Sequence, residues 1–316
     1  MHDSDRAFPV ADTPFIRRFP GDPECIRDAG DIARIERIPA DERFPCRSTW
    51  DAISIVSARC PQAIAVSYLP NAPADDDPRQ WSYADSRAEI VVSANLFHHL
   101  GLGFEESVAI LLPNIPEMLF AIWGSEAAGI AAPINPFLQA EQIANIAREA
   151  DARLLVTLAP EQSRELWEKA SAVLKLAPAI RHVVVVGGSA EGALNWVEAR
   201  ARQQSEALDF TRIFTGQETA SYFHTGGTTG VPKLARRTHR GEIVNVCQMN
   251  LAGLQPEDLG EDRSVILCGL PLFHVNGAIA TGLGAFCGGS TALLAGVQGY
   301  RTPGLPAGFW KLIERH

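Results

Sequence analysis

From residue 48 to about residue 190, short apolar runs alternate with longer segments in which apolar residues recur at helical spacing. The runs at 106–114 (ESVAILLPN) and 181–188 (RHVVVVGG) are short and end in turn residues, which is typical of buried strands. The segments at 138–150 and 161–177 are predicted to be helices of the length that joins parallel strands. This alternation predicts an α/β fold with mainly parallel sheets flanked by helices.

The pattern begins with a helix and a hairpin. Residues 49–61 (TWDAISIVSARCP) are predicted to form a helix that is capped by Ser48 or Thr49. The polar stretch at 71–80 (NAPADDDPRQ) predicts a hairpin loop with an acidic tip. Before this point the sequence has little periodicity, so we expect an N-terminal extension over residues 1–46 and a domain over residues 47–316.

The net charge of the chain limits the classes of partner that it can bind. Its formal net charge is −9, and no basic face with interleaved aromatic residues offsets that charge, so we expect no nucleic-acid partner. The N-terminal residues lack the basic and apolar segments of a secretory signal. The cysteines are widely spaced and form no CxxC pair, so we expect reduced core thiols and a cytoplasmic protein. These cysteines are Cys25, Cys46, Cys60, Cys247, Cys268 and Cys287.

One long stretch, residues 264–300, contains no Asp, Glu, Lys or Arg. A membrane-spanning helix needs about 20 predominantly apolar residues without interruption. This stretch is interrupted by Pro271, His274 and several glycines. It therefore predicts a strand, a loop, a short helix and a strand in a buried core, and no transmembrane segment.

A glycine- and threonine-rich loop follows a strand predicted at 220–224 and precedes a helix predicted at 242–249. The carboxyl end of a strand is where open α/β sheets bind ligands. Glycines allow close backbone approach, so that successive N–H groups can face one anion, while hydroxyls and a lysine add donors and charge. A Walker loop is excluded, because two residues separate the last glycine from the lysine. The predicted phosphate-binding residues are Thr225, Gly226, Gly227, Thr228, Thr229, Gly230 and Lys233.

Other residues near this loop allow both a functional and a purely structural interpretation. Arg236, Arg237 and Arg240 could extend a phosphate site, but a solvated helix face is the favoured interpretation. His224 and His239 flank the loop, and each is a secondary candidate for direct contact with a ligand. An isolated glycine cluster can also be a plain surface loop, and only the added hydroxyls and lysine argue against that reading.

The sequence YFHTGGTTGVPKLARRTH at 222–239 resembles the signature of adenylate-forming (AMP-binding) enzymes of the acyl-CoA synthetase branch. Residues 81–138, from WSYADSR to PINPFL, are similar to the opening half of that family. LPLFHVNG at 270–277 is similar to its next motif. Three motifs in order make the resemblance specific, and it covers most of the chain. One departure is Arg240-Gly241, where the family usually has an asparagine.

The resemblance implies a two-step reaction. A carboxylate attacks the α-phosphorus of Mg-ATP to give an acyl-adenylate and pyrophosphate, and the thiol of coenzyme A then takes the acyl group. ATP, Mg²⁺ and coenzyme A are thus implied, with a small-molecule carboxylic acid as substrate. The Thr225–Lys233 loop would clamp the β- and γ-phosphates. The family's catalytic lysine lies near the C-terminus of a full-length enzyme, so Lys233 is expected to act as a phosphate clamp, and no metal ligand is assigned.

The motif at 270–277 also indicates the chemical class of the carboxylic acid substrate. The resemblance implies that Phe273 and His274 line the passage to the reaction centre, although His274 could equally be a core histidine on the sequence alone. Amino-acid-activating relatives carry an aspartate directly after the phenylalanine, because a buried ammonium needs an anionic partner. His274, Val275 and Asn276 stand here instead, so we expect a fatty or other hydrophobic acid.

The resemblance extends only over the front half of a family member. It implies that the adenine pocket, the magnesium glutamate, the ribose aspartate and a small C-terminal domain follow in the complete enzyme. We therefore expect an incomplete AMP-binding domain that is inactive alone, and a complementing C-terminal half is one partner that the resemblance allows. The alternative is a non-catalytic binding or pairing module derived from such an enzyme.

Overall fold

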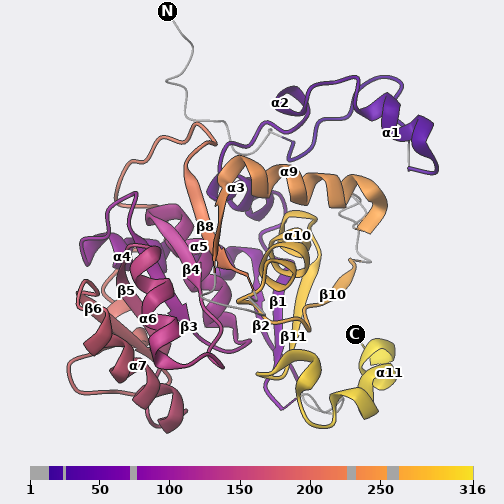
Figure 1. Ribbon diagram of the computed structural model, residues 1–316. Helices are drawn as coiled ribbons and strands as arrows, with labels where there is room; N and C mark the ends of the chain where they lie inside the picture. Colours follow the sequence, from indigo (N-terminus) through magenta and orange to yellow (C-terminus); the bar gives the residue numbers. More distant parts are fainter. Residues whose placement is uncertain (1–13, 24–25, 72–76, 226–232, 255–262, 316) are drawn as a thin grey trace, which may run out of the picture.

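The computed structural model describes residues 14–23, 26–71, 77–225, 233–254 and 263–315, and its strands form two sheets (Figure 1). Neighbouring strands are parallel in both sheets except in one hairpin of each. The seven strands of the larger sheet are, in spatial order, β7 (Leu194–Asn195), β6 (His182–Val186), β5 (Ala152–Leu158), β3 (Ser107–Leu111), β4 (Ile130–Pro133), β8 (Thr219–His224) and β9 (Leu234–Thr238). The four strands of the smaller sheet are β10 (Val265–Leu267), β11 (Thr291–Ala295), β1 (Ile64–Leu69) and β2 (Arg79–Ser82).

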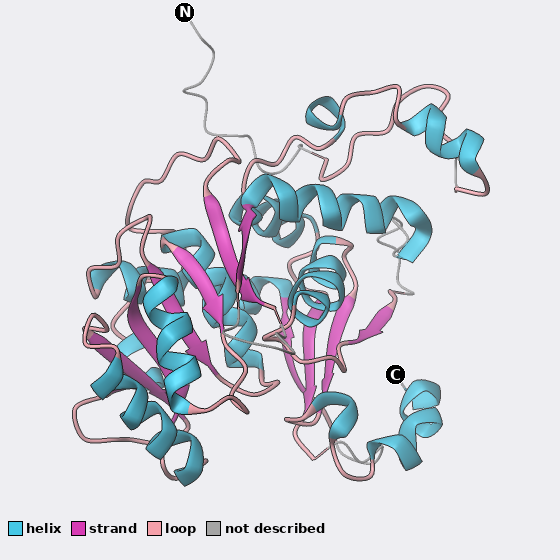
Figure 2. Cartoon of the chain, viewed as in Figure 1, coloured by secondary structure: helices cyan, strands magenta, loops and turns pink. Residues whose placement is uncertain are grey.

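Helices lie between the two sheets and over the outer face of the larger one, as Figure 2 shows. The predicted α/β class with mainly parallel sheets is therefore confirmed. The longer helices are α3 (Thr49–Arg59), α4 (Tyr83–His99), α5 (Pro116–Ala128), α6 (Ala140–Glu149), α7 (Arg164–Leu176), α9 (His239–Met249) and α11 (Leu305–Arg315). The shorter ones are α1 (Ala29–Ile35), α2 (Ala40–Arg43), α8 (Trp196–Arg200), η1 (Asn250–Leu254), η2 (Asn276–Leu283), α10 (Gly284–Cys287) and η3 (Gly299–Arg301).

The central strands of the larger sheet are apolar on both faces. Val108 and Ile110 of β3 belong to the main core, which also contains Val66 of β1 and the buried faces of α4 and α5. Ala109 and Leu111 point the other way and pack with α6 and α7. Because side chains alternate along a strand, a continuous apolar run requires a cover on both sides. The sequence pattern and the layered structure agree here.

Helix α3 begins where the sequence predicted. Ser48 is its N-cap, and the Ser48 Oγ accepts a hydrogen bond of 3.0 Å from the Asp51 N–H, while the Asp51 carboxylate accepts from the Ser48 N–H at 2.9 Å. This reciprocal pair satisfies two backbone donors that the first turn leaves free. The predicted hairpin is present as the antiparallel pair β1–β2. Part of its acidic tip, residues 72–76, lies outside the described residues.

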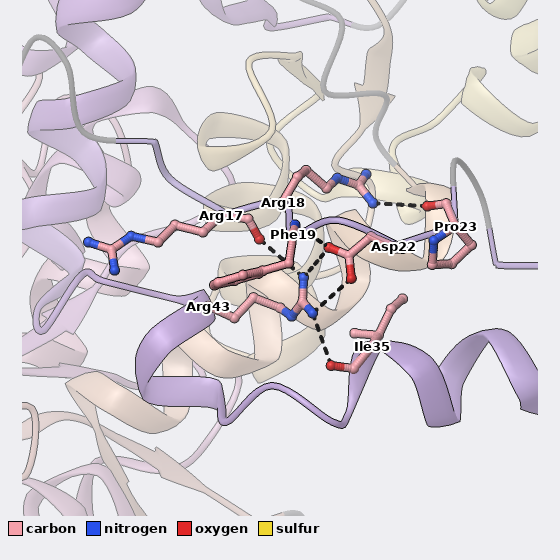
Figure 3. Close-up of polar contacts among 7 residues, drawn as sticks. All are labelled: Arg17, Arg18, Phe19, Asp22, Pro23, Ile35 and Arg43. Carbon is pink, nitrogen blue, oxygen red and sulfur yellow. Dashed lines mark hydrogen bonds and ion pairs between the residues drawn. The ribbon is translucent and has the colours of Figure 1, made fainter.

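A buried ion pair holds the segment before α3 together (Figure 3). The Arg43 side chain is 1% exposed, and its Nη1 and Nη2 donate to the two carboxylate oxygens of Asp22 at 2.6 and 3.0 Å. It also donates to the carbonyls of Arg17 and Ile35. The hydrogen bond from Arg43 lowers the pKa of Asp22. Phe15 from the same segment is buried in the main core.

The charge-free stretch at 264–300 folds as predicted. It forms β10, the π-helical segment η2, the short helix α10 and β11, in that order. Along the described parts of the chain, no helix combines the length and the apolar character that a bilayer crossing requires. The five described cysteines are buried and form no disulfide among the described residues, and burial raises the pKa of the Cys268 thiol to about 11. Cys25 lies outside the described residues.

One predicted element is wrong. Arg236 and Arg237 lie on strand β9, which pairs antiparallel with β8, and not on a solvated helix face. Helix α9 begins at His239, and Arg240 in its first turn forms an ion pair with Asp41 and donates to the Phe44 carbonyl. The basic side chains suit β9 because it is an edge strand, where one flank of the strand faces solvent.

Candidate functional site

The predicted phosphate loop connects the two strands of the β8–β9 hairpin. The Thr225 N–H donates a hydrogen bond of 2.8 Å to the Lys233 carbonyl, so these two residues close the ladder where the loop leaves and returns. Both residues are exposed. The structure therefore places Thr225 and Lys233, which we call the mouth of the loop. The other five predicted residues lie outside the described part of the chain: Gly226, Gly227, Thr228, Thr229 and Gly230.

His224, the last residue of β8, connects this mouth to two other segments. Its Nε2 accepts a hydrogen bond of 3.0 Å from the Asn135 N–H, just beyond the end of β4. Its ring stacks on Phe273, with 6.3 Å between ring centroids and 15° between the planes. Burial lowers the pKa of His224, and a charge on nearby His274 would lower it further. A neutral imidazole fits this place, because Nε2 must be free of a proton to accept from Asn135.

His274 is held by backbone contacts in a tight turn. Its N–H donates to the Pro271 carbonyl at 3.0 Å, and its carbonyl accepts from the Ala278 N–H at 3.0 Å. Its Nδ1 accepts a longer hydrogen bond, 3.3 Å, from the Asn276 N–H. Gly277 is required for this turn, because an added Cβ would collide with the Pro271 carbonyl. The imidazole itself is exposed, which excludes the core-histidine reading.

Asn114 fixes the same turn from the end of β3, and the sequence analysis missed it. The side chain is buried, donates through Nδ2 to the Leu270 carbonyl at 2.9 Å and accepts at Oδ1 from the Leu272 N–H at 2.9 Å. Its own N–H donates to the Val297 carbonyl just after β11. Asn114 thus ties the larger sheet to two loops of the smaller sheet. Its place directly after a buried strand was the available signal.

The two histidines that were secondary candidates for ligand contact lie in different surroundings. His224 lies at the site, but through its contacts with Asn135 and Phe273. His239 is fully buried, and its Nδ1 lies 3.3 Å from both the N–H and the Oγ1 of Thr49. Burial, with a smaller contribution from the positive charge of Arg212, lowers the pKa of His239 to about 3. The idea that His239 contacts a ligand directly is therefore wrong for this structure.

The strand ends of the larger sheet and the turns of the smaller sheet thus meet at one place. Asn114, Asn135 and His224 follow or end the parallel strands β3, β4 and β8, and each contacts the next segment of the site. The exposed groups there include a lysine ammonium, a threonine hydroxyl and the imidazole of His274. Such a set can bind phosphate through Lys233 and position a carboxylate near His274.

Comparison with known proteins agrees with this architecture. The AMP-binding enzyme family matches residues 54–316. The chain is 45% identical over 302 residues to marinolic acid–CoA ligase of a Pseudoalteromonas species, covering 96% of this chain and 46% of the relative. It is 30% identical over 246 residues to crotonobetaine/carnitine–CoA ligase of Salmonella heidelberg, covering 75% of this chain and 44% of that relative. The chain spans about half the length of these curated relatives.

Solved structures share the fold. The anthranilate CoA ligase AuaEII, in complex with anthranoyl-AMP, aligns with a TM-score of 0.67 at 20% identity, over 81% of this chain and 46% of its own. The apo structure of MbtA from Mycobacterium smegmatis aligns with a TM-score of 0.68 at 25% identity, over 85% of this chain and 46% of its own. Since the family match covers most of the chain and extends across every motif of the site, the chain belongs to the AMP-binding enzyme family.

Proposed function

We propose that the chain is the front half of an acyl-CoA ligase that activates a hydrophobic carboxylic acid with ATP and passes it to coenzyme A. The observation that carries this proposal is the meeting of the β8–β9 mouth with the turn at 270–276. It brings Thr225 and Lys233, suited to phosphate, to the same strand ends as His274. Family membership supplies the reaction class, and the two curated relatives named above are both CoA ligases.

In this proposal Lys233 and the Thr225–Lys233 loop hold the β- and γ-phosphates of ATP. A fixed ammonium beside departing pyrophosphate stabilises the negative charge that develops there. His224 stays neutral and holds the end of β4 and the Phe273 ring in place. His274 stands at the opening through which the acid and later the thiol approach.

The acid is proposed to lack an α-amino group. A buried ammonium requires an anionic partner, and the turn offers His274, Val275 and Asn276, none of which is anionic. The segment behind it, with Ala278 and Ile279, is buried and apolar. These side chains suit a hydrocarbon or another hydrophobic acid.

ATP is used as its Mg²⁺ complex in this chemistry. Within the described ranges, no group of three or more His, Cys, Asp or Glu side chains is placed to hold a metal ion. No described residue of the chain is therefore assigned to Mg²⁺. The remaining ATP contacts are proposed to come from a C-terminal half that corresponds to the part of the relatives that this chain does not match.

The proposed domain division follows from the same reasoning. Residues 47–316 would form the incomplete AMP-binding domain, with residues 1–46 as an extension whose described part packs on it. Losing one positioned transition-state group commonly costs on the order of 10²–10³-fold in rate. We therefore expect the 316-residue chain alone to give no detectable acyl-adenylate, and a C-terminal half to restore activity.

A fusion tests the function directly. The chain is joined to the part of marinolic acid–CoA ligase that lies beyond the matched region, and this protein is called the fused enzyme below. ATP–pyrophosphate exchange is measured with fatty acids, aromatic acids and amino acids, followed by acyl-CoA formation. The fused enzyme should favour hydrophobic acids without an α-amino group, while the isolated chain should be silent.

The complete marinolic acid–CoA ligase serves as the control that the shared C-terminal half is active. Better exchange with amino acids than with fatty acids would contradict the proposed acid class. Acyl-adenylate formation by the isolated chain would contradict the proposed division of labour. A folded fused enzyme with no exchange for any acid, beside an active control, would favour the non-catalytic binding module.

A further inference from the structure

Two glutamates are buried together beneath the β8–β9 hairpin, away from the exposed groups of the site. Glu126 lies on α5 and is 2% exposed, and Glu242 lies on α9 and is fully buried. The side chain of Glu242 reaches the hairpin, since the Ser221 Oγ of β8 donates to its Oε1 at 2.5 Å. The Arg237 Nε of β9 lies 3.6 Å from the same oxygen. The carboxyl of Glu126 lies within hydrogen-bonding reach of that of Glu242. Helix α5, helix α9 and both hairpin strands therefore contribute to the surroundings of one carboxyl pair.

The remaining oxygens of the pair have no other partner in the structure. Glu126 Oε2 and Glu242 Oε2 are both buried without a hydrogen-bond donor from another described residue. Two ionised carboxylates in this position would repel each other and lose their hydration with little compensation. A proton on one carboxyl turns this repulsion into a hydrogen bond to the other.

The surroundings decide which carboxyl holds that proton. Glu242 has the Ser221 hydroxyl and the Arg237 guanidinium, and both favour its ionised form. Glu126 has a hydrogen bond from Thr49 on α3, but no cation in direct contact among the described residues. Burial raises the pKa of Glu126 well above its usual range, with a further rise from the charge of Glu242. Burial raises the pKa of Glu242 to about 7.

Other titratable groups face the pair from the neighbouring elements. Arg212, in the segment before β8, interacts with Glu126 through its charge but donates its hydrogen bonds to the carbonyls that end α5. His239 on α9 is neutral, since its pKa is lowered to about 3. Cys287 on α10 faces Glu126, and its raised pKa keeps the thiol protonated. Arg237 is thus the cation in closest contact with Glu242 among these groups.

We propose that, at neutral pH, Glu126 is protonated and donates to the carboxylate of Glu242, and that this shared proton ties the β8–β9 hairpin to α5 and α9. The two glutamates act as positioning residues for the strands that carry the mouth of the loop. Loss of the proton to solvent would leave two buried negative charges beside one arginine and would loosen the hairpin. The inference does not depend on ATP, acid or coenzyme A.

The sign of the pH effect follows from the direction of the pKa shifts. A carboxyl whose folded pKa is raised favours folding most below its unfolded pKa of about 4.5, and this contribution is lost as the pH rises through the folded pKa. His239 acts in the opposite direction, because its folded pKa is lowered and its contribution is lost only as the pH falls below about 6.5. Above about pH 7 the His239 contribution is constant. Buried cysteines with raised pKa values also lower stability as the pH approaches the ordinary thiol pKa of about 8.5, so the contribution of Glu126 is the difference between the wild type and a Glu126 variant.

Urea unfolding of the full 316-residue chain at several pH values between about 7 and 8.5 tests the proposal. The unfolding midpoint of the wild-type chain should fall across this range. Glu126→Gln replaces the shared proton with a permanent amide donor, so its midpoint should fall less steeply than that of the wild type, with only the buried thiols contributing. Glu242→Gln removes the partner of Arg237 and should lower the midpoint throughout. Glu165→Gln, at an exposed position on α7, should follow the wild type.

A parallel fall of the midpoint in wild type and Glu126→Gln would overturn the proposal. Infrared spectroscopy keeps the test decisive if a variant does not fold. At about pH 7.5 exposed carboxyls are ionised, so the wild-type chain should retain a protonated-carboxyl stretching band. Amide exchange protection in β8 should fall as that band is lost, while protection in β5 stays constant. A wild-type chain with no such band at neutral pH would also overturn the proposal.

Discussion

The centre of the larger sheet and its β8–β9 edge are stabilised by opposite kinds of side chain. In the central strand β5, Leu154, Leu155 and Val156 are completely buried, and their neighbours on both faces are apolar. Under the hairpin at the edge, the buried residues include Ser221 and Glu242 as well as Glu126. The centre is held by apolar contacts, whereas the edge depends on hydrogen bonds and, in our proposal, on a proton.

This difference distinguishes the strands that support the fold from the hairpin that carries the candidate site. Apolar burial is non-directional and does not change with pH, so it suits strands that only need to stay in place. Hydrogen-bonded and charged contacts are directional and respond to protonation. The polar edge is also where Thr225, Lys233 and His224 approach the turn that holds His274. The following changes should therefore affect the centre and the edge differently.

The largest loss of stability is expected from the apolar centre of the sheet. Ile110→Ala removes a completely buried side chain of β3 and should lower the free energy of unfolding by about 2–5 kcal/mol. The loss should be equal at about pH 5 and pH 8, because no titrating group is involved. Urea unfolding measures it, with Ile213→Ala, at a position 78% exposed, as the control. A loss that changes strongly with pH would break the comparison.

A change of similar size, in rate and not in stability, is expected at the mouth of the loop. Lys233→Ala in the fused enzyme should lower ATP–pyrophosphate exchange by on the order of 10²–10³-fold, as loss of one charge-stabilising group does. Binding of the acid and the unfolding midpoint should hardly change, because the side chain is exposed. Lys175→Ala on α7, also exposed, is the matched control. Equal exchange rates in Lys233→Ala and the parent would remove Lys233 from the proposed phosphate site.

A smaller effect is expected where the two sheets are joined. Asn114→Ala removes the donor to the Leu270 carbonyl and the acceptor for the Leu272 N–H. Leaving these buried groups unpaired should cost about 1–3 kcal/mol of unfolding free energy. Amide exchange should become faster at 270–275 and stay unchanged in β5. Uniform loss of protection across the chain would indicate a general core defect instead.

The smallest effect on stability is expected at His274. Its imidazole is exposed, so His274→Ala should change the free energy of unfolding by no more than about 0.5 kcal/mol. In the fused enzyme the same change should alter the preference among acids or the rate of thiol transfer. The substrate panel described above measures both. An unchanged panel and unchanged transfer would remove His274 from the acyl opening.

The same contrast explains how much the sequence could predict. Strands β3 and β6 could be predicted because their apolar runs are short, continuous and bounded by turn residues. Strand β9 could not, because LARRT has no apolar run, and its strand character comes from pairing with β8. Its basic side chains look like a solvated helix face until the edge of the sheet is known.

The site was predictable in part for a related reason. Lys233 and His274 stand in local motifs that resemble those of known enzymes. Asn114 makes its contacts with residues 156 and 158 positions away, and such a pairing leaves no local pattern. Glu126 and Glu242 look like ordinary polar positions on two helices, and only the folded structure shows that their side chains meet. Long-range polar contacts are the part that a single sequence does not reveal.

The central claim is that the mouth of the hairpin and the turn at 270–276 form one site. Backbone amide NMR of the isotope-labelled chain, titrated with a non-hydrolysable acyl-adenylate analogue of a fatty acid, tests it most directly. The amides of Thr225, Lys233 and His274 should shift together with one apparent dissociation constant, while those of β5 and β6 stay still. Shifts at Thr225 and Lys233 without His274, or shifts confined to another face of the molecule, would contradict the account.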